Sequence, residues 1–213
     1  MQNPFLKIDR VIPIIIGANF VVTVAVSLLA PIFALFVTAE IHRGSAQVVG
    51  FALALYWGVK SILQLPIARY IDRNHGEYDD LYFMTGGMVF GALVLFGYYF
   101  ATQPWHIYVL HGFFGLADAF VVPPLFAIFT RHIDKGNEGF EWSLQSSFSF
   151  GGGAAVGGAL GGMLVAVMGY RYVFVLAAVL YLASAGIFWS LRPHIMSRVK
   201  PPVERLPVEV KRV

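Results

Sequence analysis

The chain has 213 residues, of which 58% are hydrophobic and only 13% are charged, and its formal net charge is +3. Soluble domains carry about 25% charged residues, so this composition leaves too little polar surface for a soluble fold and favours a membrane protein. Cysteine is absent, which excludes disulfide bonds and cysteine-ligated metal sites, and the basic residues form no amphipathic stripe that would indicate a nucleic-acid partner.

Six apolar runs are long enough to cross about 30 Å of hydrocarbon, which requires about 20 helical residues. The first run is too long for the apolar region of a signal peptide, so we expect it to be a retained helix. The segments between the runs are short and carry charges and turn-forming residues. We predict an all-α integral membrane protein with one domain, 11–191, and six transmembrane helices near 11–38, 48–71, 81–101, 106–130, 143–168 and 172–191.

Lysine and arginine gather on one side of the predicted bundle. They occur in the N-terminal segment 1–10, near 69–73 and 131–135, and in the C-terminal tail 192–213. Cytoplasmic loops carry an excess of these residues. We therefore predict a multi-pass protein of the cytoplasmic (inner) cell membrane, with both termini and the basic tail in the cytoplasm.

A weak internal repeat relates the two halves of the chain. "PIFALF" begins at Pro31 in the first run and "PLFAIF" begins at Pro124 in the fourth. A similar spacing carries the second run onto the fifth and the third onto the sixth. Because three crossings are an odd number, the second copy would be inverted in the membrane. The pattern predicts two inverted three-helix repeats, as in secondary transporters.

Two ionisable residues lie deep inside predicted helices, Lys60 in the second run and Asp118 in the fourth. Lys60 is about 18 Å from either end of its helix at 1.5 Å per residue, too far for its side chain to reach the surface. An unpaired charge there costs at least ~3 kcal/mol. Since Asp118 lies at a similar depth, we expect the two to meet or to share a water-filled cavity.

Other polar residues accompany this pair at helical spacing. Two interpretations stay open. The polar residues line a transport cavity and take part in coupling, because Lys60 and Asp118 can titrate, or they only stabilise packing through interhelical hydrogen bonds. The candidates are Tyr56, Lys60 and Gln64 on the second helix, Asn19, Thr23 and Ser27 on the first, and His111 and Asp118 on the fourth.

The fifth run is rich in glycine. Small residues recur every four positions, which allows another helix to approach closely. We assign this helix-packing seam to Ser149, Gly153, Gly157 and Gly161, together with the neighbouring Gly158 and Gly162.

Four segments resemble motifs of the major facilitator superfamily, and together they cover about 5–191. "ARYIDRNHGE" is similar to the family's signature loop: Asp72 and Arg73 match, Ala68 stands where Gly is usual, Gly76 is one place late and Glu77 replaces a basic residue. "HGFFGLADAFVVPP" resembles the Arg-x-x-x-Gly stretch, with His111 at the arginine position and Gly115 at the glycine. "GAAVGGALGG" at 153–162 resembles the antiporter motif with Gly158 in place of proline, and "GYRYVFVLAA" resembles the start of the sixth helix.

The resemblance implies one six-helix half of a twelve-helix transporter that works by alternating access. It implies secondary active transport of a small molecule, which we expect to be proton-coupled, without a cofactor. The expected partners are the lipid bilayer, the substrate, and a second copy or a different six-helix half. Asp72, Arg73 and Gly76 would form a cytoplasmic gating loop.

Enzymatic alternatives fit the sequence poorly. An intramembrane aspartyl protease needs two aspartates close together; "GLAD" at 115–118 and "YD" at 78–79 offer Asp118 and Asp79, but Asp79 lies in a charged loop. A rhomboid-type serine protease would need a Gly-x-Ser-Gly motif before a suitable histidine. The sequence therefore predicts no enzyme. A non-transporting membrane module built on half a transporter, such as a subunit, sensor or truncated remnant, stays open as the alternative.

Overall fold

The computed structural model of the chain describes residues 9–74 and 76–195. Within these residues the regular structure is entirely helical. The elements are α1 (Val11–Leu29), α2 (Phe33–Glu40), α3 (Ala46–Asn74), α4 (Glu77–Gly97), the 3-10 turn η2 (Tyr98–Phe100), α5 (Pro104–His132), α6 (Glu138–Leu144), the π-helical segment η3 (Gln145–Gly152), α7 (Gly153–Met168), α8 (Tyr170–Trp189) and α9 (Arg192–Ile195).

Six stretches are long and apolar enough to cross a membrane, which confirms the predicted number of spans and the all-α class. The first joins α1 to α2 and the fifth joins α6, η3 and α7. The six stretches are Val11–Glu40, Ala46–Arg73, Glu77–Phe100, Pro104–His132, Glu138–Met168 and Tyr170–Ile195.

The two similar Pro-containing segments differ in local structure. Pro31 lies in the break between α1 and α2, whereas Pro123 and Pro124 lie inside the unbroken α5. Proline removes a backbone donor and clashes with the preceding turn, but whether the helix ends there depends on its neighbours. The inverted repeat stays a prediction.

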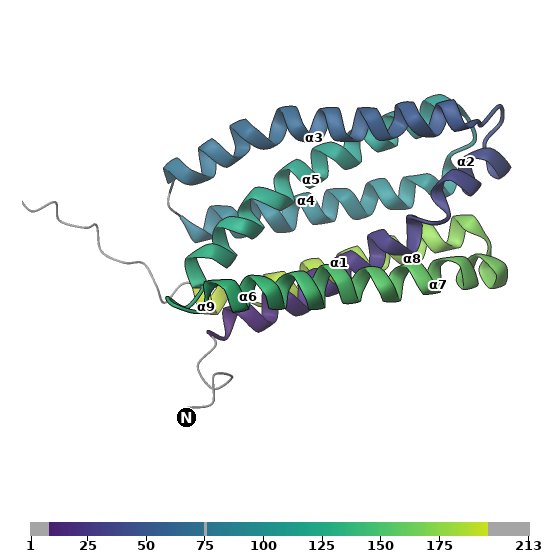
Figure 1. Cartoon of the computed structure of the whole chain (residues 1–213). Coiled ribbons are helices and arrows are strands. Elements are labelled where there is room, and N and C mark those ends of the chain that lie inside the picture. Colours follow the sequence, from purple (N-terminus) through teal and green to yellow (C-terminus); the bar gives the residue numbers. More distant parts are fainter. Residues whose placement is uncertain (1–8, 75, 196–213) are drawn as a thin grey trace, which may run out of the picture.

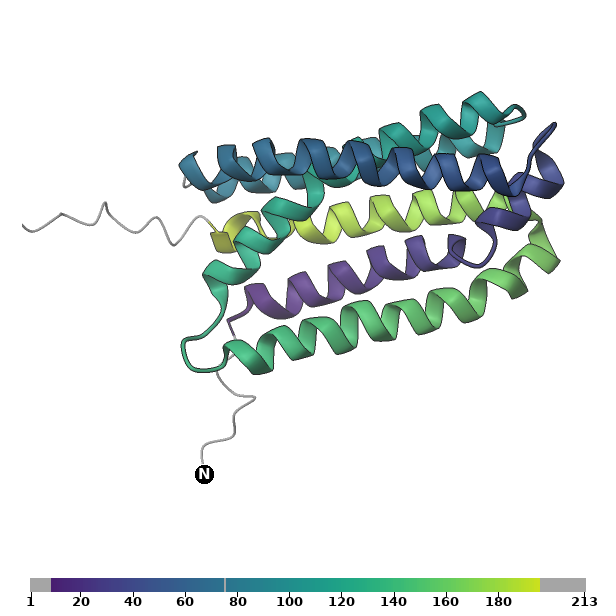
Figure 2. The same cartoon turned by 45° about the horizontal axis from the view of Figure 1, so that its top comes forward.

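The helices form two groups that pack against each other (Figure 1). In one group α3 packs on α5, and α5 also packs on α4; in the other, α1 packs on both α7 and α8. Contacts of α4 with α8 join the two groups. Figure 2, from a second direction, also shows α1 and α7 side by side. We call one end of the bundle the α2 end, where the segments 41–45 and 101–103 lie. We call the other end, which holds the segment 133–137, the α9 end.

Three glycines bring α7 into backbone contact with α1. A Cβ atom added at Gly153 would lie 2.8 Å from the Thr23 Cβ, and one added at Gly157 would lie 2.5 Å from a backbone oxygen of α1. At Gly161 it would lie 2.3 Å from the Leu28 carbonyl oxygen. Larger residues cannot occupy these positions without separating the helices.

The prediction for the other residues of the seam is correct for Ser149 and wrong for Gly158 and Gly162. A Cβ atom added at Gly158 or Gly162 meets no atom within 4 Å. Successive helical residues are rotated by about 100°, so these two glycines point away from α1. Ser149 does belong to the contact, because its hydroxyl donates to the Ile16 carbonyl oxygen at 2.8 Å.

Gly161→Ala and Gly162→Ala form a matched pair that tests this seam. We expect Gly161→Ala to lower the free energy of unfolding by about 1–3 kcal/mol, because its Cβ atom overpacks the contact with Leu28. Gly162→Ala should leave stability unchanged or raise it by up to about 1 kcal/mol, since alanine favours the helix. Thermal unfolding in mild detergent measures both, and equal losses in the two variants would contradict the seam.

Candidate functional site

An ion pair lies at the centre of the bundle. Lys60 and Asp118 are the middle residues of α3 and α5, which are both 29 residues long. The Lys60 Nζ lies 3.0 Å from the Asp118 Oδ2, and the two side chains are 14% and 15% exposed. The structure thus brings together the two ionisable residues that the sequence placed at matching depth.

Two tyrosines complete the surroundings of the carboxylate. The Tyr56 hydroxyl donates to the Asp118 Oδ2, and the Tyr181 hydroxyl of α8 donates to the Asp118 Oδ1 at 3.0 Å. The Lys60 Nζ also donates to the Tyr56 hydroxyl at 3.2 Å. A buried charge is tolerated when it is paired and hydrogen-bonded, and here both oxygens of the α5 carboxylate have donors, which come from α3 and α8. Sequence reasoning missed Tyr181, because nothing in an apolar run distinguishes one tyrosine from another.

Aromatic rings hold the ammonium group. The Lys60 Nζ lies 5.1 Å from the centroid of the Trp57 ring and 5.4 Å from that of Tyr56. Cation–π attraction at such distances gains strength where water is excluded. These rings therefore replace part of the hydration shell of the Lys60 ammonium.

The other cavity candidates do not join this cluster. The His111 Nδ1 is hydrogen-bonded to the Tyr98 hydroxyl rather than to Asp118, and its ring lies 4.3 Å from that of Phe33. Gln64 lines a hollow of about 420 Å³ towards the α9 end, together with Asp72.

Two residues of the polar stripe on α1 face α7. Thr23 and Ser27 pack against the glycines of the seam, and the Thr23 hydroxyl donates to the backbone oxygen of Asn19 at 2.9 Å. Asn19 itself is buried. Thr23 thus takes part in helix packing, and the role of Asn19 and Thr23 in a transport cavity stays a prediction.

A second ion pair, between an exposed arginine and a buried carboxylate, joins two helices near the α9 end. Arg131 of α5 donates from Nη1 to the Oδ2 of Asp80 in α4, whose side chain is only 1% exposed. The candidate gating residues lie nearby: Asp72 and Arg73 are exposed in the last turns of α3, and Gly76 precedes α4. Asp72 lines the same hollow as Arg131. Their gating role stays a prediction.

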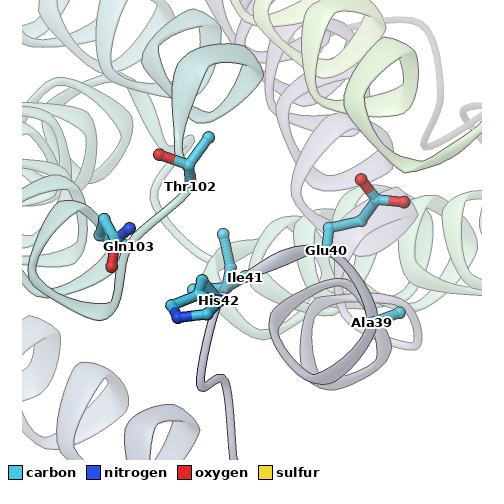
Figure 3. Close-up of a pocket in the computed structure, with 6 residues that line it drawn as sticks. All are labelled: Ala39, Glu40, Ile41, His42, Thr102 and Gln103. Atoms are coloured by element: carbon cyan, nitrogen blue, oxygen red, sulfur yellow. The ribbon is translucent and has the colours of Figure 1, made fainter.

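Arg171 holds the α2 end together. It donates from Nη2 to the Ala101 carbonyl oxygen at 3.1 Å and from Nε to the Glu40 carboxylate at 3.4 Å. Beside this contact lies a hollow of about 540 Å³ lined by Ala39, Glu40, Ile41, His42, Thr102 and Gln103. Figure 3 shows the Glu40 carboxylate turned away from His42 and Gln103.

No group of three or more His, Asp or Glu side chains in 9–74 and 76–195 is arranged to bind a metal ion.

Six apolar spans around a central ion pair define a multi-pass membrane protein. A family model described as Major Facilitator Superfamily matches residues 15–212. The chain therefore belongs to the major facilitator superfamily, as its motifs indicated.

Two curated relatives extend well beyond the matched region. The "Multidrug resistance protein MdtG" of Dickeya zeae is 27% identical over 194 residues, which are 90% of this chain and 45% of that protein. The protein of the same name from Serratia proteamaculans is 25% identical over 187 residues, or 86% of this chain and 44% of that protein. The chain thus spans less than half the length of the curated relatives it matches.

Neutral substitutions test the central pair. Lys60→Met or Asp118→Leu alone should destabilise the protein by about 3–5 kcal/mol, because each strands a buried charge, whereas the double variant should recover most of this loss. Lys60→Arg keeps the opposite charges and serves as the control. Thermal unfolding in mild detergent provides the comparison, and losses that simply add in the double variant would show that the two residues do not form a pair.

Proposed function

We propose that this chain forms half of a secondary transporter, which moves a small molecule across the membrane by alternating access and couples this movement to protons. The observation that carries the proposal is the Lys60–Asp118 pair at the midpoint of two spans. Ionisable residues at this depth are costly and usually functional. The name of the two relatives refers to multidrug resistance. It supports foreign organic compounds as the first substrates to test.

Protonation of Asp118 would change contacts on three helices at once. A proton on the carboxylate removes the negative charge that holds Lys60 of α3. It also alters the acceptors available to Tyr56 of α3 and to Tyr181 of α8. A proton taken up by Asp118 of α5 can therefore weaken its contacts with α3 and α8 together. Alternating access requires an element of this kind, whose two conformations differ in population with protonation.

We place the α9 end in the cytoplasm. Arg69, Arg73, Arg131 and Lys135 all lie towards this end, and cytoplasmic loops are rich in such residues. The proposal locates the protein in the cytoplasmic membrane with both termini inside. Residues 1–8 of the N-terminal segment and 196–213 of the basic tail lie outside the described residues.

A second six-helix half would cover the outer faces of α3 and α7. In an 18-residue apolar window of the spans that contain α3 and α7, only 11% and 17% of the residues are buried, against 56% in Glu77–Phe100. Ile62 on α3 and Val167 on α7 are 72% and 84% exposed. We propose that a second copy or a different half packs on the side formed by α1, α3, α5 and α7.

Proton flux tests the transport proposal. The protein is expressed in inside-out membrane vesicles from a strain that lacks its own efflux pumps, a pH gradient is imposed, and ethidium, chloramphenicol or deoxycholate is added. We expect at least one of these compounds to discharge the gradient with the wild-type protein. Asp118→Asn should abolish this response, because the substituted residue can no longer take up the proton. No response to any compound, or an equal response in Asp118→Asn, would favour a non-transporting module.

Cysteine cross-linking tests the partner face, and the chain offers a cysteine-free background. We expect Ile62→Cys on α3 to form a disulfide-linked dimer in membranes, because its side chain would lie at the interface of two copies. Leu93→Cys on α4 is the matched control, since Leu93 is 62% exposed but lies on a helix outside the proposed interface. Equal cross-linking of both variants, or a strictly monomeric protein, would contradict the dimer.

A further inference from the structure

A cavity lined by aromatic rings lies beside the break between α1 and α2. Its volume of about 460 Å³ falls within the range of small-molecule sites, roughly 300–1,000 Å³. Side chains from both groups of helices contribute to its wall. The rings are those of Phe33, Tyr56, Trp57, Tyr98, Phe114 and Phe174.

The chemistry of the wall selects against charged ligands. Among the described residues that line the cavity, none is Asp, Glu, Lys or Arg. The nearby Lys60 ammonium is already paired with Asp118, so it is not an available counter-ion. An anionic ligand would lose its hydration without gaining a partner, and a cationic one would have to share the Tyr56 and Trp57 rings with the Lys60 ammonium that already lies over them. A neutral aromatic ligand can stack on the rings. His111 and Tyr98 add polar groups to the wall, and the two are hydrogen-bonded to each other.

Two residues belong to both the cavity and the ion pair. The Tyr56 side chain lines the cavity while its hydroxyl donates to Asp118. The Trp57 side chain also lines the cavity, and the Lys60 Nζ lies over its ring. A ligand in the cavity would therefore contact the groups that hold the two charges in place.

We propose that this cavity binds a neutral, aromatic small molecule as its substrate, with Tyr56 and Trp57 forming the wall that is shared with the Lys60–Asp118 pair. This assignment rests on the transport function proposed above. It adds a substrate class and a location at the α1–α2 break.

Two dyes with one ring skeleton test the proposed class. The full chain in lipid nanodiscs is titrated with neutral N-phenylnaphthylamine and with its sulfonated derivative, anilinonaphthalene sulfonate, and the saturable rise in dye fluorescence is measured. We expect saturable binding of the neutral dye and at least about tenfold weaker binding of the sulfonate. Absence of saturable binding, or equal affinity for the two dyes, would overturn the proposal.

Two alanines of α2 locate the site. Ala34 lines the cavity and Ala39 lines the hollow of Figure 3, and both are exposed, so phenylalanine can be introduced without disturbing a core. Ala34→Phe should weaken binding of the neutral dye at least about tenfold, while Ala39→Phe should leave it unchanged. Leu53→Trp, which fills the same cavity from α3, provides a second variant if Ala34→Phe fails to fold. Equal affinities in the filled and control variants would place the dye elsewhere and overturn the site.

Equilibrium binding requires no pH gradient, so this experiment separates the two proposals. Saturable binding that Ala34→Phe abolishes would support the site even if no compound discharges a gradient in vesicles. Proton flux without dye binding would support transport and overturn the neutral aromatic class.

Discussion

An ammonium group and a carboxylate meet at the middle of two membrane-spanning helices, each about 21 Å from the helix ends at 1.5 Å per residue. Neither charge is stable alone at that depth, so the pair fixes the depth of α3 relative to α5. Gly115 lets this contact form, because a Cβ atom there would lie 2.5 Å from the Tyr56 carbonyl oxygen. Tyr181 then ties α8 to the same carboxylate. The position of three helices depends on one side chain, Asp118.

The second group of helices is held by a different force. Glycines bring α7 against α1 with no charge involved, and such contacts gain from close van der Waals packing rather than from exclusion of water. Between the seam and the ion pair, the break at Pro31 leaves room for the ring-lined cavity. Tyr56 and Trp57 line this cavity and also contact the ion pair, so the proposed substrate site and the proposed proton site share two residues.

Helix number and the depth of buried charges could be predicted from the sequence, because hydrophobic length and helical rise are regular. Counting residues along two runs sufficed to bring Lys60 and Asp118 together. Rotation about each helix axis could not be predicted, since it is set by tertiary packing. For that reason Gly158 and Gly162 were wrongly included in the seam, Tyr181 was missed, and His111 bonds Tyr98 rather than approaching the carboxylate. The same limit applies to Pro31 and Pro124, whose similar sequences give a break in one helix and none in the other.

The most direct test of the central pair is a distance measured in a bilayer. Solid-state NMR on protein with nitrogen-labelled lysine and carbon-labelled aspartate reports dipolar coupling between the Lys60 Nζ and the Asp118 carboxyl carbon. The Nζ–Oδ2 distance of 3.0 Å predicts a measurable through-space coupling. This coupling should disappear in Lys60→Gln. A wild-type spectrum without this coupling would contradict the ion pair and the coupling mechanism built on it.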